Sequence, residues 1–350
     1  MWNKKYKKLK KDLREKSLSL GFPLFGISKP NPFKELKYFT SWLDNGFNAG
    51  MQYLKNRLDE RTSLKKYFPE VRSIISVGMP YFNPETTPKN YSSSNPQIAH
   101  YAKGLDYHDI MKKRLNKIVN FLNQVFPCKT RICVDTSPVL DRLYAYHAGL
   151  GWFGKNTCIL NQNYGSYFFL GEILTDIDFP HDSKASDHCG TCTRCLDACP
   201  TDAFPKPYVL NANKCISYWT IEYRGSLPQN QRSNIGAHLF GCDICQEVCP
   251  WNHHTKNIKV DPVYQPKWSN ETILQKILET TPQNFSTIFQ GMALKRAKRQ
   301  GLLRNAAWVI VNLKYKKFLP SLKKIIKELP EEESDLKQEI QNAVDQLNQI

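Results

Sequence analysis

The sequence lacks any apolar run long enough to cross a lipid bilayer. One of its longest, YFFLGEIL at residues 167–174, is far shorter than the roughly 20 apolar residues of a membrane-spanning helix. The basic N-terminus, residues 1–22, has neither the apolar segment of a secretion signal nor a small-residue cleavage site. We therefore expect a cytoplasmic protein with no membrane partner.

Two common nucleotide-binding motifs are also missing. No GxGxxG follows a predicted strand, and there is no GxxxxGK(S/T), so neither a Rossmann site nor a P-loop is supported. Positive charge is in large excess, with a formal net charge of +17. Such a charge suits a polyanionic partner, or it reflects only a lysine-rich composition, and charge alone does not decide.

Cysteine is abundant, with 11 residues in the chain. Because the cytosol keeps thiols reduced, clustered cysteines there indicate metal binding or catalysis rather than disulfides. The stretch HCGTCTRCLDACP, residues 188–200, has the ferredoxin spacing C-x2-C-x2-C-x3-C-P. In that pattern three cysteines bind one [4Fe–4S] cluster and the fourth binds a neighbouring cluster.

A second half follows at residues 241–251, GCDICQEVCPW, but it has one ligand fewer because Leu239 stands three positions before Cys242. Cys215 is the only cysteine between the halves and completes a set of eight. We therefore predict two [4Fe–4S] clusters, the first bound by Cys189, Cys192, Cys195 and Cys249, and the second by Cys199, Cys215, Cys242 and Cys245. Structural zinc is the alternative, but zinc modules generally use two C-x2-C pairs separated by a dozen or more residues. The remaining Cys128, Cys133 and Cys158 are expected to be ordinary buried thiols.

The chain as a whole predicts a multidomain α+β protein. Residues 1–180 alternate helical and strand patterns, which indicates an α+β or α/β domain. Residues 181–256 contain the cluster motifs, and residues 256–268 have the composition of a linker. Helical patterns in residues 268–350 resemble a HEAT-type repeat, which cannot bury its faces alone and should pack on the rest of the protein. Strands are expected at 72–82, 130–135 and 166–179, and helices at 34–47, 108–127, 139–151, 271–279, 302–314, 318–329 and 334–350.

Three stretches together resemble one family. They are VDTSPVLDRLYAYHAGLGWFGKNTCIL at 134–160, the paired ferredoxin motifs with CISYWTIEYRG at 215–225, and GLLRNAAWVIVN at 301–312. In this order they are similar to the epoxyqueuosine reductases, from about residue 20 to 320. The resemblance implies an α/β cobalamin-binding domain, a ferredoxin-like domain with two [4Fe–4S] clusters and a HEAT-like C-terminus. It also implies the last step of queuosine biosynthesis, the two-electron reduction of epoxyqueuosine at the wobble position of tRNA.

The resemblance also implies roles for individual residues. Asp135 corresponds to the catalytic acid beside cob(II)alamin, and burial near the corrin would raise its pKa. Arg57, Trp152 and Lys155 fall in stretches that line the corrin. Arg224 falls near the anticodon, and a basic run is a candidate for phosphate contacts, with Lys295, Lys298, Arg296, Arg299 and Arg304. The expected partners are a tRNA with a GUN-type anticodon and a reductant such as flavodoxin or ferredoxin, and we expect a monomer.

Simpler interpretations remain beside these. Taken alone, Asp135 in the sequence DTSP is typical of a helix N-cap. Lys155 could be an exposed loop residue, and His108 is expected to be structural, because DYHDIM lacks the glycine of the D-x-H-x-x-G cobalamin motif. For the whole protein, the alternatives are a corrinoid iron–sulfur enzyme of the reductive dehalogenase kind and an electron carrier without chemistry of its own.

Overall fold

The computed structural model describes residues 4–30, 33–82, 94–253, 258 and 260–350. The expected linker at 256–268 and the expected domain boundary at residue 256 therefore lie partly outside the described residues. No helix in these ranges is long and apolar enough to cross a membrane.

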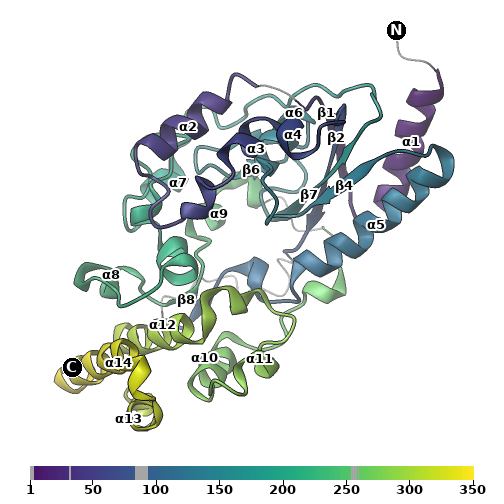
Figure 1. Ribbon diagram of the computed structural model, residues 1–350. Helices are drawn as coiled ribbons and strands as arrows, with labels where there is room; N and C mark the ends of the chain where they lie inside the picture. Colours follow the sequence, from purple (N-terminus) through teal and green to yellow (C-terminus); the bar gives the residue numbers. More distant parts are fainter. Residues whose placement is uncertain (1–3, 31–32, 83–93, 254–257, 259) are drawn as a thin grey trace.

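A four-stranded sheet forms the centre of the N-terminal region (Figure 1). Its strands lie in the order β1, β2, β7, β4, and every neighbouring pair is antiparallel. This pairing decides between the two types that the sequence left open, because an antiparallel sheet with flanking helices is α+β. The bounds are β1 Leu24–Ser28, β2 Ser73–Pro80, β7 Phe168–Thr175 and β4 Thr130–Cys133.

Helices cover both faces of this sheet. On one face α1 (Lys4–Ser19) and α5 (Tyr107–Val125) bury their apolar sides against β1, β2 and β7. On the other face lie α3 (Leu58–Thr62), α4 (Leu64–Tyr67) and α6 (Asp141–His147), with Leu64 and Tyr144 in the apolar core. The helix α2 (Leu36–Asp44) and the short turn η1 (Gln52–Leu54) precede α3.

The two ferredoxin motifs fold back on each other, so that α7 (Arg194–Asp197) packs beside α9 (Ile244–Glu247). The segment between them contains η4 (Ala212–Lys214), a π-helical turn η5 (Tyr218–Glu222), α8 (Gln229–Asn234) and β8 (His238–Phe240). One small ladder connects this region to the preceding one, because β3 (Gln97–Ile98) pairs in parallel with β8. A second small ladder, β5 (Trp152–Phe153) with β6 (Ile159–Leu160), lies within the preceding region.

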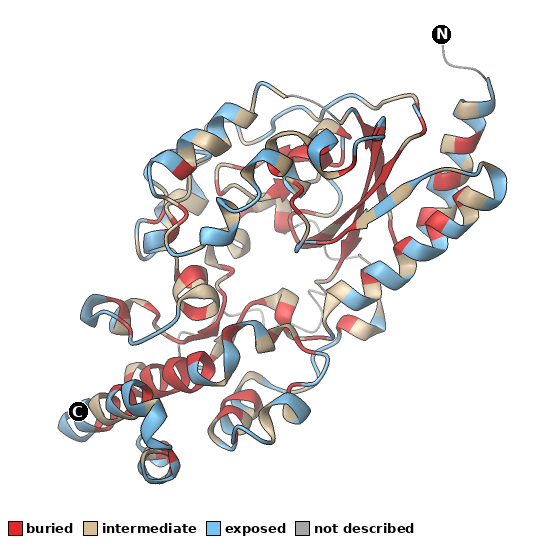
Figure 2. Ribbon diagram, in the orientation of Figure 1, coloured by how far each residue is buried: buried red, intermediate tan, exposed pale blue. Residues whose placement is uncertain are grey.

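The C-terminal helices pack around α12, which is buried along most of its length (Figure 2). Apolar residues from β8 and from residues 98–102 share its core, so this region packs on the rest of the protein. Buried Glu339 stabilises this packing, because it accepts hydrogen bonds from the Trp308 indole and the Leu227 amide. The bounds are α10 Asn270–Leu278, α11 Phe285–Ile288, η9 Ala293–Ala297, α12 Lys298–Asn312, α13 Leu319–Glu328 and α14 Ser334–Gln349.

Candidate active site and cluster sites

Asp135 lies in a tight turn just beyond the end of β4. Its φ is +53°, a left-handed conformation that aspartate tolerates better than most residues, and the Thr136 amide donates to the Val134 carbonyl at 2.6 Å. The next helix, α6, begins only at Asp141, with Leu140 at its N-cap position. The N-cap interpretation of Asp135 is therefore wrong, since Asp135 lies six positions before the first residue of the helix.

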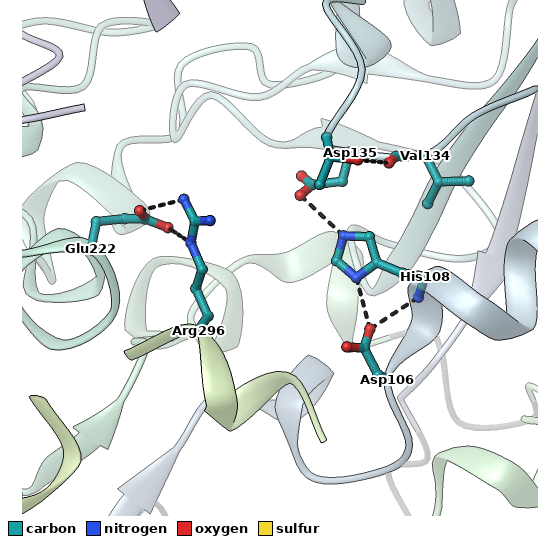
Figure 3. A network of polar contacts seen from close by, with 7 residues as sticks. Asp106, His108, Val134, Asp135, Glu222 and Arg296 are labelled. Atoms are coloured by element: carbon teal, nitrogen blue, oxygen red, sulfur yellow. Dashed lines mark hydrogen bonds and ion pairs between the residues drawn. The ribbon is translucent and has the colours of Figure 1, made fainter. Parts of the chain in front are cut away.

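A hydrogen-bonded chain links Asp135 to the start of α5 (Figure 3). The Oδ2 of Asp135 lies 3.2 Å from Nε2 of His108, and Nδ1 of His108 lies 2.7 Å from Oδ1 of Asp106. Asp106 also accepts the His108 amide as the N-cap of α5. Burial lowers the pKa of His108, but its hydrogen bonds to Asp106 and Asp135 outweigh this and raise the pKa to about 9. At neutral pH, His108 is thus a cation between Asp106 and Asp135.

Two expectations change at this point. His108, expected to be structural, contacts Asp135 directly. The side chain of Asp135, expected to be buried, is 56% exposed in the protein alone. What orders this carboxylate in the structure is the cationic imidazole.

The opposite wall of the site comes from the C-terminal region (Figure 3). Arg296 of η9 binds both carboxylate oxygens of Glu222, at 2.9 and 2.7 Å, and its guanidinium lies over the ring of Tyr53. Asp135 is close enough to contribute to raising the pKa of Arg296, after the larger effect of Glu222. Arg224 donates to the Arg296 carbonyl at 2.7 Å and so supports this wall. Both residues were expected to contact tRNA: Arg296 lies near Asp135, and Arg224 contacts the backbone of Arg296.

The remaining basic residues of the expected tRNA surface have different environments. Lys298 is exposed and Lys295 is half-buried. Arg299 is mostly buried in an ion pair with Glu333 at 2.8 Å. Arg304 is only 2% exposed and donates to the carbonyls of residues 219, 223 and 225. The expected phosphate contact of Arg304 is therefore wrong for this structure, because its guanidinium is used inside the protein.

The residues expected to line the corrin are split between two places. Arg57, in a left-handed turn with φ +60°, pairs with Glu60 and lies over the ring of Tyr67. Lys155 donates to the carbonyls of Gly190 and Cys192 at 2.8 and 2.9 Å. Trp152 is 2% exposed and packs in the same small cluster as Cys249. Trp152 and Lys155 thus contact the first cysteine set, and neither residue is an exposed loop position.

Four cysteines line a cavity of about 280 Å³: Cys189, Cys192, Cys195 and Cys249. Burial, followed by like-charge repulsion from Cys249 and Cys189, raises the pKa of Cys195 to about 11. The described sulfur atoms are not gathered around a single-ion site. Four thiols around a cavity are the donor chemistry of a [4Fe–4S] cluster.

The other four cysteines also lie together. Burial raises the pKa of Cys242 well above its ordinary value, with further contributions from Cys215 and Cys199. The pKa of Cys245 is raised in the same way by burial, then by Cys158 and Cys242. Cys242 thus lies close to Cys215 and Cys199, and Cys158 lies close to Cys195, Cys249 and Cys245. The assignment of all eight cysteines to two clusters stays a prediction.

Comparisons with known proteins agree with this arrangement. Residues 188–252 match a family model for a 4Fe-4S double cluster binding domain, and residues 61–136 match one described as epoxyqueuosine reductase QueG, DUF1730. An epoxyqueuosine reductase of Cellulophaga algicola is 38% identical over 296 residues, which cover 84% of this chain and 95% of that protein. The chain belongs to the epoxyqueuosine reductase family. The resemblance and the double-cluster domain predicted from the sequence are confirmed.

Solved structures of epoxyqueuosine reductases share the fold. That of Bacillus subtilis, in a form whose catalytic aspartate loop is swung out of the active site, has a TM-score of 0.88 at 28% identity and covers 98% of this chain and 91% of its own. A second epoxyqueuosine reductase, crystallised with an epoxyqueuosine-modified tRNA-Tyr stem loop, has a TM-score of 0.78 at 28% identity and covers 98% of this chain and 100% of its own. These matches confirm the multidomain α+β fold.

Sequence reasoning missed three residues of the site: His108, Tyr53 and Glu222. A signal for His108 was present, since Asp106 two positions earlier is the N-cap of a helix and can orient the imidazole. Its other partner, Asp135, is 27 positions away, which no local pattern reveals. Tyr53 and Glu222 had no comparable signal, because their contacts with Arg296 span distant segments.

Proposed function

We propose that this protein is an oxidoreductase that reduces epoxyqueuosine to queuosine at the wobble position of tRNA. The observation that carries the proposal is Asp135, held in a left-handed turn and hydrogen-bonded to a cationic histidine in a chain of this family. The solved relative with a modified stem loop supports the substrate class, and the relative with a catalytic aspartate loop supports the role of Asp135.

Asp135 acts in this proposal as the general acid. Removal of the epoxide oxygen as water consumes two electrons and two protons, and a positioned carboxyl group can protonate the leaving oxygen. Such assistance contributes about 10²–10⁴-fold to a rate. His108, cationic up to a pH of about 9, stabilises the carboxylate that remains after the transfer, and Asp106 keeps its ring in place.

Cobalamin is proposed to bind beside Asp135. The donors there fit its amide and phosphate oxygens, because the Nε of Arg61 is buried without a partner among the described residues. Arg61 lies close enough to Asp135, Tyr53 and Arg57 for their charges to affect its pKa. Reduced cobalt, when bound, supplies the nucleophile or one-electron partner that breaks the carbon–oxygen bond. Trp152 and Lys155 are reassigned to the first cluster, whose loop they contact.

The eight cysteines are proposed to bind two [4Fe–4S] clusters in the sets given above. Electrons would enter at the first set, because Gly190, Thr191 and Thr193 of its loop are exposed. The second set lies next to η5, which carries Glu222 toward the Asp135 site. A low-potential one-electron protein such as flavodoxin or ferredoxin fits the exposed loop as reductant.

The tRNA is proposed to enter between Asp135 and the wall formed by Arg296. A wobble base must leave its stack to reach a catalytic group, as enzymes that act on bases generally require. Arg224, Lys295, Arg296 and Lys298 are the residues that we propose for phosphate or nucleotide contacts. Tyr53, 43% exposed, offers a ring on which a flanking base could stack.

An anaerobic assay separates this proposal from its two alternatives. Protein reconstituted with iron, sulfide and cobalamin is incubated with a reductant and a tRNA stem loop that contains epoxyqueuosine, and the nucleosides are analysed by mass spectrometry. Conversion to queuosine is the expected result. Cobalamin binding without tRNA binding would instead favour a dehalogenase-like enzyme, and failure to bind cobalamin would favour a simple electron carrier.

A further inference from the structure

The turn between β5 and β6 contains two polar side chains, Lys155 and Asn156, to which the proposed mechanism gives no task. Two backbone hydrogen bonds of 2.8 Å close this turn, one from the Gly154 amide to the Cys158 carbonyl and one from the Thr157 amide to the Gly154 carbonyl. The turn is therefore a short, fixed segment, and the side chains that it presents have a defined origin.

These two side chains contact different ferredoxin motifs. The Nζ of Lys155 donates to the carbonyls of Gly190 and Cys192, at 2.8 and 2.9 Å. Asn156 is only 3% exposed, and its side-chain amide donates to the Cys245 carbonyl at 3.1 Å. The turn is thus attached to both motifs, which fixes where the ammonium group of Lys155 lies relative to the cysteines.

Tyr208 ties the backbone of Lys155 to the loop that contains the first cysteines. Its amide donates to the Lys155 carbonyl at 2.9 Å, and its hydroxyl donates to the Oδ2 of Asp187 at 2.6 Å. The Oδ1 of Asp187 accepts the Cys189 amide at 2.8 Å. Tyr208 has a left-handed φ of +67°, a conformation that persists in a bulky residue only where its surroundings require it. The contact between Lys155 and the cysteine loop is therefore built from both backbone and side chain.

Lys155 also lines the cavity of the first cysteine set, beside Cys189, Cys192, Cys195 and Cys249. Its half-buried ammonium group contacts two carbonyl oxygens rather than a carboxylate, so these contacts do not neutralise its charge. The carboxylate of Asp187 is near enough to offset part of that charge, but its oxygens bind Tyr208 and the Cys189 amide instead. Arg194 also lines the cavity but is exposed, where water screens a charge more strongly.

A fixed positive charge at this place has a defined effect on a [4Fe–4S] cluster. Four thiolates give the bound cluster a net negative charge, and reduction adds one more negative charge. A nearby cation stabilises the reduced form more than the oxidised form, because Coulomb attraction grows with the charge of the partner. The net charge around a cluster and its exposure to solvent are among the factors that set its reduction potential.

We propose that Lys155 is a positioning residue that raises the reduction potential of the first [4Fe–4S] cluster, so that a low-potential one-electron carrier can reduce it. This inference rests on the proposed cluster assignment. In the step concerned the carrier loses one electron and the cluster gains it, and no bond of Lys155 forms or breaks. Lys155 touches neither the epoxide nor Asp135, so it acts only through the cluster.

Two substitutions separate this effect of charge from a simple role in holding the loop. Lys155→Gln removes the positive charge but keeps a side-chain amide that can donate a hydrogen bond. Lys155→Arg keeps the positive charge and several donors. If charge is what matters, the arginine variant should behave like the wild type and the glutamine variant should not. Lys323→Gln, at an exposed position of α13, removes one positive charge elsewhere in the protein and is the control.

The test is a redox titration of anaerobically reconstituted protein, followed by electron paramagnetic resonance of the reduced clusters. The wild type should show two reduction waves. In Lys155→Gln one wave should move to a more negative potential, by about a tenfold change in the ratio of oxidised to reduced cluster. For a one-electron couple this corresponds to about 59 mV. The other wave should stay in place, and both waves of Lys155→Arg and Lys323→Gln should match the wild type.

Iron and sulfide analysis of each variant accompanies the titration. Equal potentials in the wild type and Lys155→Gln would overturn the inference, as would an equal shift in Lys155→Arg and Lys155→Gln. Loss of one cluster from both Lys155 variants would also overturn it, because Lys155 would then hold the loop rather than set the potential. The titration needs no tRNA. Waves that behave as expected in a wild type that does not convert the stem loop would therefore overturn the proposed function and leave this inference standing.

Discussion

Asp135, the proposed general acid, is positioned by a local backbone conformation and by one distant side chain. The left-handed turn directs its carboxyl group away from the end of β4, and His108 meets it from the first turn of α5. Because Asp106 fixes the imidazole by both an amide and a ring hydrogen bond, the chain has little freedom to reorient. A general acid works best when its geometry is set in advance.

The pKa of His108 provides a prediction at this scale. Titration of the His108 ring by NMR should give a pKa of about 9 in the wild type and a value closer to the ordinary 6.5 or so in Asp106→Asn. A histidine whose folded pKa is raised stabilises the protein below its unfolded pKa, and this stabilisation declines as pH rises through the folded value. Between pH 6.5 and about 9, the wild type should therefore lose more thermal stability than Asp106→Asn. An unshifted pKa in both proteins would refute the ion-pair chain.

What the sequence could predict at single residues depended on distance along the chain. The cluster cysteines were recognisable because their spacing is local and specific to one kind of cofactor. The contact of His108 with Asp135 and the burial of Arg304 depend on segments that meet only in the folded protein. The contacts of Lys155 with Gly190 and Cys192 could not be predicted for the same reason, since those residues lie in the following region of the chain.

Among the elements, α12 organises the C-terminal half. It is buried from Gly301 to Val311, and Arg304 from its middle holds three carbonyls of the segment around η5. That segment includes Glu222, which forms an ion pair with Arg296. The wall opposite Asp135 is therefore fixed by a buried arginine rather than by residues at the surface.

A substitution of Arg304 should show this structural role. Arg304→Ala would leave three partly buried carbonyls without their donor, and each such loss costs about 1–3 kcal/mol. We expect a loss of about 3 kcal/mol or more in the free energy of unfolding, measured by urea denaturation. The matched change Lys298→Ala, at an exposed position of the same helix, should alter stability by less than about 0.5 kcal/mol. Equal stability of the two variants would show that Arg304 does not hold η5.

The main elements could be predicted from the sequence because apolar periodicity records which face is buried. The helices at 107–125 and 334–349 and the strands at 73–80 and 168–175 lie close to the expected ranges. The strand β1 and the parallel pairing of β3 with β8 were not expected. Both are short, and their partners lie far along the chain, at residues 74–78 for β1 and 238–240 for β3, so the pairing leaves no local pattern.

At the scale of the whole molecule, the three regions converge on one place. The sheet domain provides Asp135 and His108, the cluster region provides Glu222, and the C-terminal region provides Arg296 (Figure 3). A net charge of +17 adds long-range attraction for an anionic substrate. Cofactors, electrons and tRNA are therefore proposed to meet at a junction that no single domain could form alone.

The electrostatic part of this proposal predicts how affinity depends on salt. The logarithm of the association constant for the stem loop should fall linearly with the logarithm of salt concentration, with a slope of about −0.7 for each phosphate neutralised on a single strand. Lys298→Ala should reduce the magnitude of that slope by roughly one phosphate. Fluorescence anisotropy over a range of potassium chloride concentrations measures both. A slope near zero would contradict the proposal that the protein binds tRNA through its phosphates.

The most direct measurement of the central claim is single-turnover conversion by reconstituted protein under anaerobic conditions, with nucleosides quantified by mass spectrometry. The wild type should convert epoxyqueuosine to queuosine, and Asp135→Asn should bind the stem loop with similar affinity and convert it about 10²–10⁴-fold more slowly. An Asp135→Asn protein that converts the stem loop at the wild-type rate would contradict the assignment of Asp135 as the proton donor.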